Sequence, residues 1–268
     1  MLGKLFKHEF KQTSRVIPLL YIILVLCSLT FIVGYKTNIN WLIGIGIMLC
    51  IFSAIAVIAA TFIVIIVRFY KSMFLNEGYL TYTLPVKPSA NLFPKFTVAL
   101  FWIFSSIIVI LGVFLLVLFS LGVFNTDFMK TIYNNIFKYD YVVKMLILTA
   151  VMMVIQTIFF LMQVFFAMSL GNTPAFHKLS IGGPILIYIV MYFIIQLINL
   201  VLTLFIPIGV SIGPGGFSFV FENMLTSFTA QTGSNVTIGL AGIIFEVVGT
   251  IALFFVTKYI LDKKVSLK

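Results

Sequence analysis

The chain has 268 residues, of which 62% are hydrophobic and only 9% are charged, and its formal net charge is +10. Soluble domains contain about 45–50% apolar and about 25% charged residues, so this composition excludes an ordinary water-soluble protein. In a bilayer the backbone must be hydrogen-bonded within helices or a closed barrel, and long apolar runs without period-two alternation favour helices. We therefore expect an all-α polytopic membrane protein.

The first fifteen residues form a basic, amphipathic segment. Leu2, Phe6 and Phe10 recur at intervals of four, which places them on one face of a helix, while the lysines fall elsewhere. Such a helix can lie on the membrane surface before the chain turns into the bilayer. We expect an interfacial elbow helix over residues 1–15; the alternative is a basic tail that only enforces orientation.

Six apolar runs follow, each long enough to cross a hydrocarbon core of about 30 Å. The predicted spans cover residues 16–34, 41–67, 96–124, 142–171, 184–210 and 238–260. We expect them to form a single six-helix transmembrane domain over residues 16–268. The first run is too long for a cleavable signal and lacks a small-residue cleavage site.

The basic residues predict the orientation of these spans. Of the seventeen Lys and Arg residues, thirteen lie in the N-terminal segment, in the loops after the second and fourth spans, or at the C-terminus. The positive-inside rule then places both termini in the cytoplasm. Because the charge is a topology signal and no basic, aromatic-laced soluble face is present, we expect no nucleic-acid partner.

The predicted outer loop at residues 211–237 is rich in Gly, Ser and Thr and contains the run Gly213-Pro214-Gly215-Gly216. Gly and Pro mark a bent, non-helical connection, to which we add a short dipping helix over residues 217–228. Cys27 and Cys50 fall inside spans, where isolated thiols are typical small core residues.

Motifs for catalysis or nucleotide binding are not found. The sequence has no GxxxxGK[ST] phosphate loop, no HExxH and no Ser-His-Asp set, and His8 and His177 have no neighbouring ligands. We expect no enzyme, and no catalytic, cofactor-binding or metal-binding residue in this chain.

A few polar side chains occupy the predicted spans, and each can either line a substrate path or join helices by hydrogen bonds. The candidates are Gln156, Gln163, Gln196, Asn199 and Glu246.

Glu246 is the strongest of these candidates. An ionised acid at the centre of a span costs about 2.5 kcal/mol or more, so we expect this side chain to be protonated or paired. Gly239, Gly242 and Gly249 share its helical face, and small residues mark close helix packing. Glu246 should therefore face protein rather than lipid, either as a substrate or gating contact or as a structural hydrogen-bond donor.

The segment between the second and third spans, residues 69–94, combines aromatic side chains with charges and three prolines. A passive linker would favour Gly and Ser, whereas exposed aromatics rimmed by charge are typical of a protein–protein contact. We expect a cytoplasmic partner to bind here.

This segment resembles a known family. Glu77–Leu80 (EGYL), followed by Thr83–Val86 (TLPV), looks like the inner-loop signature of permeases of bacterial ATP-binding-cassette (ABC) transporters of the ABC-2 exporter type. The starting run MLGKLFKHEFKQTSR and the loop LGNTPAFHK after the fourth span are similar to theirs, although Gly171-Asn172 replaces the family's usual Gly-Gln pair.

The resemblance implies a permease subunit that pairs with an identical or related permease in membrane lipid. ATP and magnesium would be bound by a separate cytoplasmic ABC ATPase, and the exported substrate would be an amphiphile, such as an antimicrobial peptide or a lipid. The implied ATPase contacts are Asn76, Glu77, Gly78, Tyr79, Leu80, His177 and Lys178. Usage rich in Lys, Ile, Asn and Phe is compatible with the cell membrane of a Gram-positive bacterium. A secondary carrier and a non-transporting membrane scaffold are the alternatives.

Overall fold

The computed structural model describes residues 2–75, 88–125, 130–131, 133–137, 139–179, 182–213, 216–221 and 236–263. Six helices among these residues are long and apolar enough to cross a membrane, as predicted, which indicates a multi-pass membrane protein. The chain divides after Phe128 into two compact units, and each is described by itself. The orientation of the termini and the single six-helix domain stay predictions.

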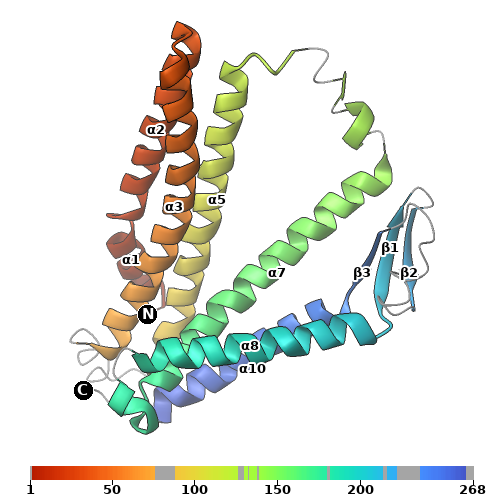
Figure 1. Ribbon diagram of the computed structural model, residues 1–268. Coiled ribbons are helices and arrows are strands. Elements are labelled where there is room, and N and C mark those ends of the chain that lie inside the picture. Colours follow the sequence, from red (N-terminus) through yellow and green to blue (C-terminus); the bar gives the residue numbers. More distant parts are fainter. Residues whose placement is uncertain are drawn as a thin grey trace. The chain divides into compact units, whose positions relative to one another are not determined.

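The described residues of the first unit form one short helix and three long ones, which are labelled in Figure 1. Its elements are α1 (Leu2–Thr13), α2 (Ile17–Thr37), α3 (Asn40–Phe74), the 3₁₀ turn η1 (Pro88–Asn91) and α5 (Leu92–Ser120). Proline is favoured in the first turn of a helix, where its missing N–H costs no hydrogen bond. Pro18 lies in the first turn of α2, so the chain ends α1 and starts a separate helix at this point.

Close packing holds α2 and α3 together as a helical hairpin. Asn38 ends α2 with a positive φ of 55°, a conformation that Asn tolerates better than most residues. Deeper in the hairpin, a Cβ added to Gly46 would lie 2.5 Å from Cα of Phe31, so only glycine permits this approach. Cys27 and Cys50 are free thiols on these two helices.

The elbow helix α1 packs against α5. The Phe10 ring stacks on Trp102 with centroids 5.1 Å apart and meets Phe101 edge-on at 5.3 Å. The predicted amphipathic helix is therefore present, and part of its apolar face is covered by protein.

The second unit contains three long helices and a small sheet. Its elements are the π-helical turn η2 (Tyr133–Phe137), α7 (Asp140–Gly171), the 3₁₀ turn η3 (Pro174–Leu179), α8 (Gly182–Phe205), β1 (Gly209–Gly213), β2 (Gly216–Val220), β3 (Val236–Gly239) and α10 (Ala241–Lys263).

A tight corner joins α7 to α8. A Cβ added to Gly171 would lie 2.5 Å from the backbone nitrogen of Pro184, so the last turn of α7 touches the first turn of α8. Asn172 and Thr173 are buried here and donate side-chain hydrogen bonds to the carbonyls of Met168 and Leu170, at 2.8 and 2.7 Å. These bonds satisfy helix-end carbonyls that lack intrahelical partners.

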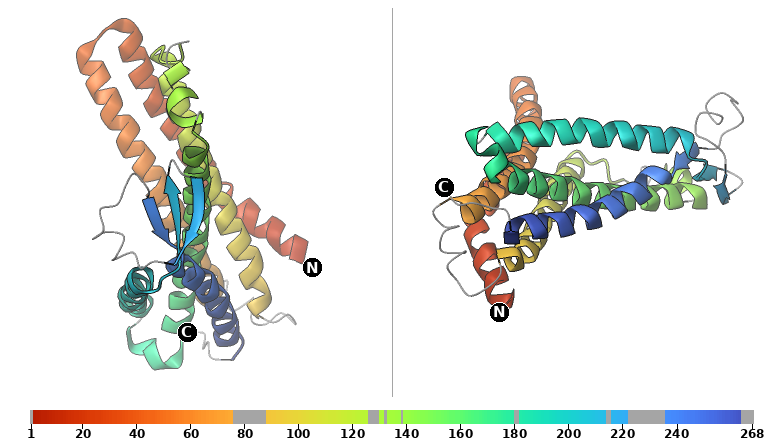
Figure 2. Two further views of the ribbon diagram at one scale, coloured as in Figure 1. Left: turned by 90° about the vertical axis from the view of Figure 1, so that its right-hand side faces the viewer. Right: turned by 90° about the horizontal axis from the view of Figure 1, so that it is seen from below.

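The sheet corrects the all-α prediction. β1 lies between β2 and β3 in an antiparallel sheet at the ends of α8 and α10 (Figures 1 and 2). The dipping helix predicted over residues 217–228 is wrong at its start, because residues 217–220 belong to β2; residues 222–228 lie outside the described part. Two short alternating runs flanking a Gly-Pro-Gly-Gly turn favour a hairpin over a helix.

Candidate functional site

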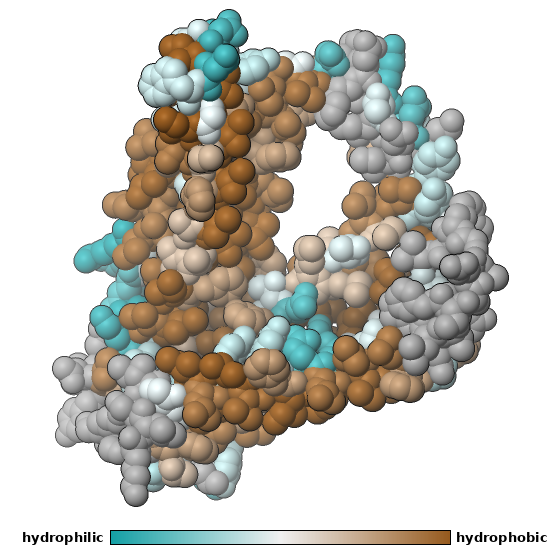
Figure 3. Space-filling view, viewed as in Figure 1, coloured by the Kyte–Doolittle hydropathy of each residue, from teal (hydrophilic) through white to brown (hydrophobic). Residues whose placement is uncertain are grey.

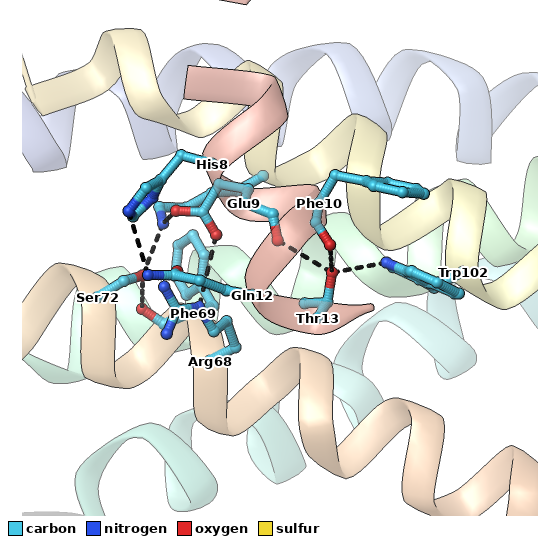
Figure 4. Close-up of polar contacts among 10 residues, drawn as sticks. His8, Glu9, Phe10, Gln12, Thr13, Arg68, Phe69, Ser72 and Trp102 are labelled. Atoms are coloured by element: carbon cyan, nitrogen blue, oxygen red, sulfur yellow. Dashed lines mark hydrogen bonds and ion pairs between the residues drawn. The ribbon is translucent and has the colours of Figure 1, made fainter. Parts of the chain in front are cut away.

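Among the described residues, each unit contains a cluster of polar side chains that joins its helices. The first, which we call the anchor cluster, consists of Glu9 of α1, Arg68 and Ser72 of α3, and Lys95 of α5 (Figure 4). It joins three helices at the end of the unit where α3 stops and α5 starts.

Lys95 is the centre of the anchor cluster. Its ammonium group forms an ion pair with the Glu9 carboxylate and donates a hydrogen bond to Oγ of Ser72 at 2.7 Å. Nε of Arg68 lies 3.7 Å from the second oxygen of Glu9. The side chains of Lys95 and Glu9 are only 6% and 13% exposed, so the ion pair joins two charges that are largely removed from water.

A ladder of hydroxyl groups continues from this cluster along α5. The indole Nε1 of Trp102 donates to Oγ1 of Thr13 at 2.7 Å, and the Thr13 hydroxyl lies 3.0 Å from the carbonyl oxygen of Glu9 (Figure 4). One turn further, Oγ of Ser106 is hydrogen-bonded to Tyr21 of α2 at 2.9 Å and to Thr61 of α3 at 3.0 Å. Every helix of the first unit therefore has a polar link to α5.

The anchor cluster brackets the predicted ATPase-binding segment. Ser72 comes four residues before Asn76, and Lys95 follows η1 on the other side of the segment. Residues 76–80 lie outside the described residues. His177 and Lys178 lie in η3, and the structure does not describe their side chains.

The second cluster, which we call the amide–acid cluster, joins α8 to α10. Nδ2 of Asn199 donates to Oε1 of Glu246 at 3.1 Å, and Oγ1 of Thr203 lies 3.4 Å from Oδ1 of Asn199. An amide thus takes the place of a basic partner for the acid, and among the described residues Glu246 forms no ion pair.

The glycines of α10 make this contact possible. A Cβ added to Gly242 would lie 2.3 Å from Oδ1 of Asn199 and 2.6 Å from Oγ1 of Thr203. A Cβ added to Gly249 would lie 2.9 Å from the ring of Phe159 on α7. The prediction that glycines mark close helix packing is confirmed for Gly242 and Gly249, whereas Gly239 lies in β3 and not on the helical face of Glu246. Glu246 is half-buried against α8.

The remaining polar candidates, Gln156, Gln163 and Gln196, differ in exposure and in hydrogen bonding. Gln196 is exposed and shares one face of α8 with Asn199 and Thr203, where polar side chains interrupt the apolar surface of the helix (Figure 3). Gln163 is buried on α7, and its Oε1 has no hydrogen-bond partner in the described part of the chain, whereas Gln156 is exposed. No hydrogen bond links either glutamine to the amide–acid cluster among the described residues.

The first unit also has an apolar groove of about 280 Å³ between α2, α3 and α5. Leu24, Phe31, Ile51, Val113 and Phe114 are among its lining side chains, and none of the lining residues is charged. Such a lining can accept only an apolar moiety, such as an acyl chain or an aliphatic side chain.

The sequence does not predict the anchor cluster, because Lys95 falls in the predicted loop after the second span and Glu9 in the predicted elbow helix, 86 residues away. Within the described residues no group of three His, Cys, Asp or Glu side chains could hold a metal ion.

No family model, curated protein or solved structure matches this chain.

Proposed function

We propose that this chain is the membrane-spanning permease subunit of an ATP-driven exporter, working with a separate cytoplasmic ATPase that binds ATP and magnesium. The observation that carries the proposal is the anchor cluster. It links the elbow helix to the two helices that flank residues 76–87, the segment whose motif resembles that of ABC-2 exporters.

A permease driven from outside the membrane needs a stiff connection between the driven loop and its spans. Ser72 on α3 and Glu9 on α1 both contact the buried ammonium group of Lys95. Because separating Lys95 from Glu9 would break an ion pair between two largely buried charges, a displacement of either loop end should move α1, α3 and α5 together. This coupling is what an ATPase bound at residues 76–80 would use.

The apolar groove of the first unit and the polar side chains of α8 fit an amphiphilic substrate such as a peptide or a lipid. The apolar groove of the first unit suits a hydrocarbon group, and the exposed amide of Gln196 beside the amide–acid cluster offers hydrogen bonds. A second permease subunit, identical or related, would complete the exporter in the cell membrane of its bacterial host.

Purification of the tagged chain from native-host membranes tests the proposal. We expect an ABC ATPase to co-purify and its ATP hydrolysis to be retained in the complex. Tyr79→Ala should abolish this association without impairing membrane insertion. Tyr133→Ala removes a 62%-exposed aromatic side chain from η2 and serves as the matched control that retains the ATPase.

Two results would contradict the proposal. If no ATPase accompanies the wild-type chain, or if both tyrosine variants bind it equally well, the segment is not its docking site. Substrate movement by the purified chain in liposomes without ATP would favour a secondary carrier instead.

A further inference from the structure

The sheet is held close to the ends of two membrane spans. Only three residues separate the end of α8 at Phe205 from the start of β1 at Gly209, and Leu240 alone separates β3 from α10. The backbone N–H of Leu240 donates to the carbonyl of Ile208 at 2.9 Å, which ties the two connections together. Since an extended chain spans at most about 3.3–3.6 Å per residue, the sheet cannot move far from the membrane surface.

The strand register gives the sheet one apolar and one polar face. Phe217 of β2 pairs with Ile212 of β1, Phe219 pairs with Val210, and Val210 also pairs with Ile238 of β3. Directly paired residues point to the same side of a sheet, so these side chains share one face.

The opposite face carries Ser218, its partner Ser211 and Thr237, together with glycines and Val220, which pairs with Gly209. With Val220 as the exception, apolar and polar side chains alternate, and the sheet is amphipathic.

The aromatic rim of the apolar face is uncovered. Val210 and Ile212 on the central strand are only 1% and 2% exposed. On the edge strand Phe217 and Phe219 are 42% and 68% exposed, and Phe221 just beyond it is 81% exposed. We call these three side chains the phenylalanine row; the rings of Phe217 and Phe219 are in edge-to-face contact at 5.5 Å.

We infer that the phenylalanine row inserts into the lipid of the membrane interface beside α8 and α10. An exposed contiguous apolar patch marks a binding face, and Phe is among the side chains that amphipathic segments at the membrane interface bury at the boundary of headgroups and acyl chains. The short connections hold the row at that depth, and residues 205–221 contain no charged side chain that would oppose insertion. The occupant is therefore lipid, and the inference does not depend on the presence of an ATPase.

Tryptophan fluorescence can test this placement. In a Trp41→Phe parent the only other tryptophan is Trp102, which is buried, so the parent's emission can be measured and subtracted. Phe219→Trp is compared with Ser218→Trp, its neighbour on the polar face. Each variant is reconstituted in phosphatidylcholine vesicles, with or without bromine atoms near the headgroup end of the acyl chains.

We expect brominated lipid to quench Phe219→Trp strongly and Ser218→Trp weakly, while aqueous acrylamide gives the reverse order. If Phe219→Trp is poorly produced, Phe221→Trp on the same row replaces it. Quenching of the row by acrylamide alone would overturn the inference, because the row would then face water. Protection from both quenchers would overturn it in favour of a protein partner, and equal lipid quenching of both faces would refute the assigned orientation.

Discussion

Replacement of Lys95 by methionine tests the anchor cluster most directly. The variant keeps an unbranched side chain that is one atom shorter, but it removes the ion pair with Glu9 and the 2.7 Å hydrogen bond to Ser72. Breaking a buried pair from one side costs about 3–5 kcal/mol, because the remaining charge is left uncompensated. Arg68, 3.7 Å from Glu9, remains as a weaker partner. We therefore expect a loss in the free energy of unfolding of about 2–3 kcal/mol.

A double-mutant cycle with Glu9→Gln separates the ion pair from its surroundings. With both charges removed, the penalty of an uncompensated charge disappears, so the double variant should be more stable than the sum of the single losses predicts. We expect a coupling energy of at least about 1 kcal/mol between the two positions. Equilibrium unfolding in mixed detergent micelles, followed by helical circular dichroism, measures all four proteins.

The exposed pair on α7 provides the control. Nζ of Lys144 lies 2.7 Å from Oδ2 of Asp140, with side chains 48% and 80% exposed. Surface pairs of this kind contribute about 0.2–1 kcal/mol, so Lys144→Met should have a small effect. If Lys95→Met were as mild as Lys144→Met, and additive with Glu9→Gln, the anchor cluster would not couple its three helices.

Three further predictions concern the second unit. Gly242→Ala would place a methyl group 2.3 Å from Oδ1 of Asn199, so it should destabilise the unit by about 1–3 kcal/mol in the same unfolding assay. Gly44→Ala, whose added methyl group meets no atom within 4 Å, is the neutral control. Equal effects of the two variants would refute the close packing of α10 against α8. Glu246→Gln retains an oxygen that accepts the Asn199 hydrogen bond, so the free energy of unfolding should stay within about 0.5 kcal/mol of wild type. A large loss of stability would show that the charge is essential to the fold. Normal stability with lost export would assign the acid a direct role in transport. Gly171→Ala should destabilise the corner between α7 and α8 and lower the unfolding temperature, whereas an unchanged temperature would contradict the 2.5 Å approach.

The six spans could be predicted because their signal is local and long. A run of apolar residues that exceeds the bilayer thickness has few other stable structures. Their ends were less predictable, as the start of α5 illustrates. Because Lys95 is charged, the predicted span starts after it, at residue 96. In the structure α5 already begins at Leu92, and the charge of Lys95 is compensated by Glu9. The partner lies 86 residues away, so no local pattern could identify it.

The sheet shows a different failure. Alternation of Val210 and Ile212, followed by a Gly-Pro-Gly-Gly turn and by Phe217 and Phe219, is a usable hairpin signal. Each run is only five residues long, and the overall apolar composition of the chain favours a membrane-dipping helix. In the candidate site, the small-residue face of α10 predicts that Glu246 packs against protein. That Asn199 is its hydrogen-bond partner depends on the rotation of α8 about its axis, which the nearly uniform apolar sequence of α8 does not reveal.

The separation of Glu9 and Lys95 also has a consequence for biogenesis. At about 5–20 residues per second, the ribosome needs roughly 4–17 s to add the residues between them. During this interval the Glu9 carboxylate has no Lys95 to pair with, although α2 and α3 already follow it. In that interval the acid has only the weaker contact with Arg68 of α3, 3.7 Å away, so the ion pair and the aromatic packing of α1 against α5 form only after the third long helix has been synthesised.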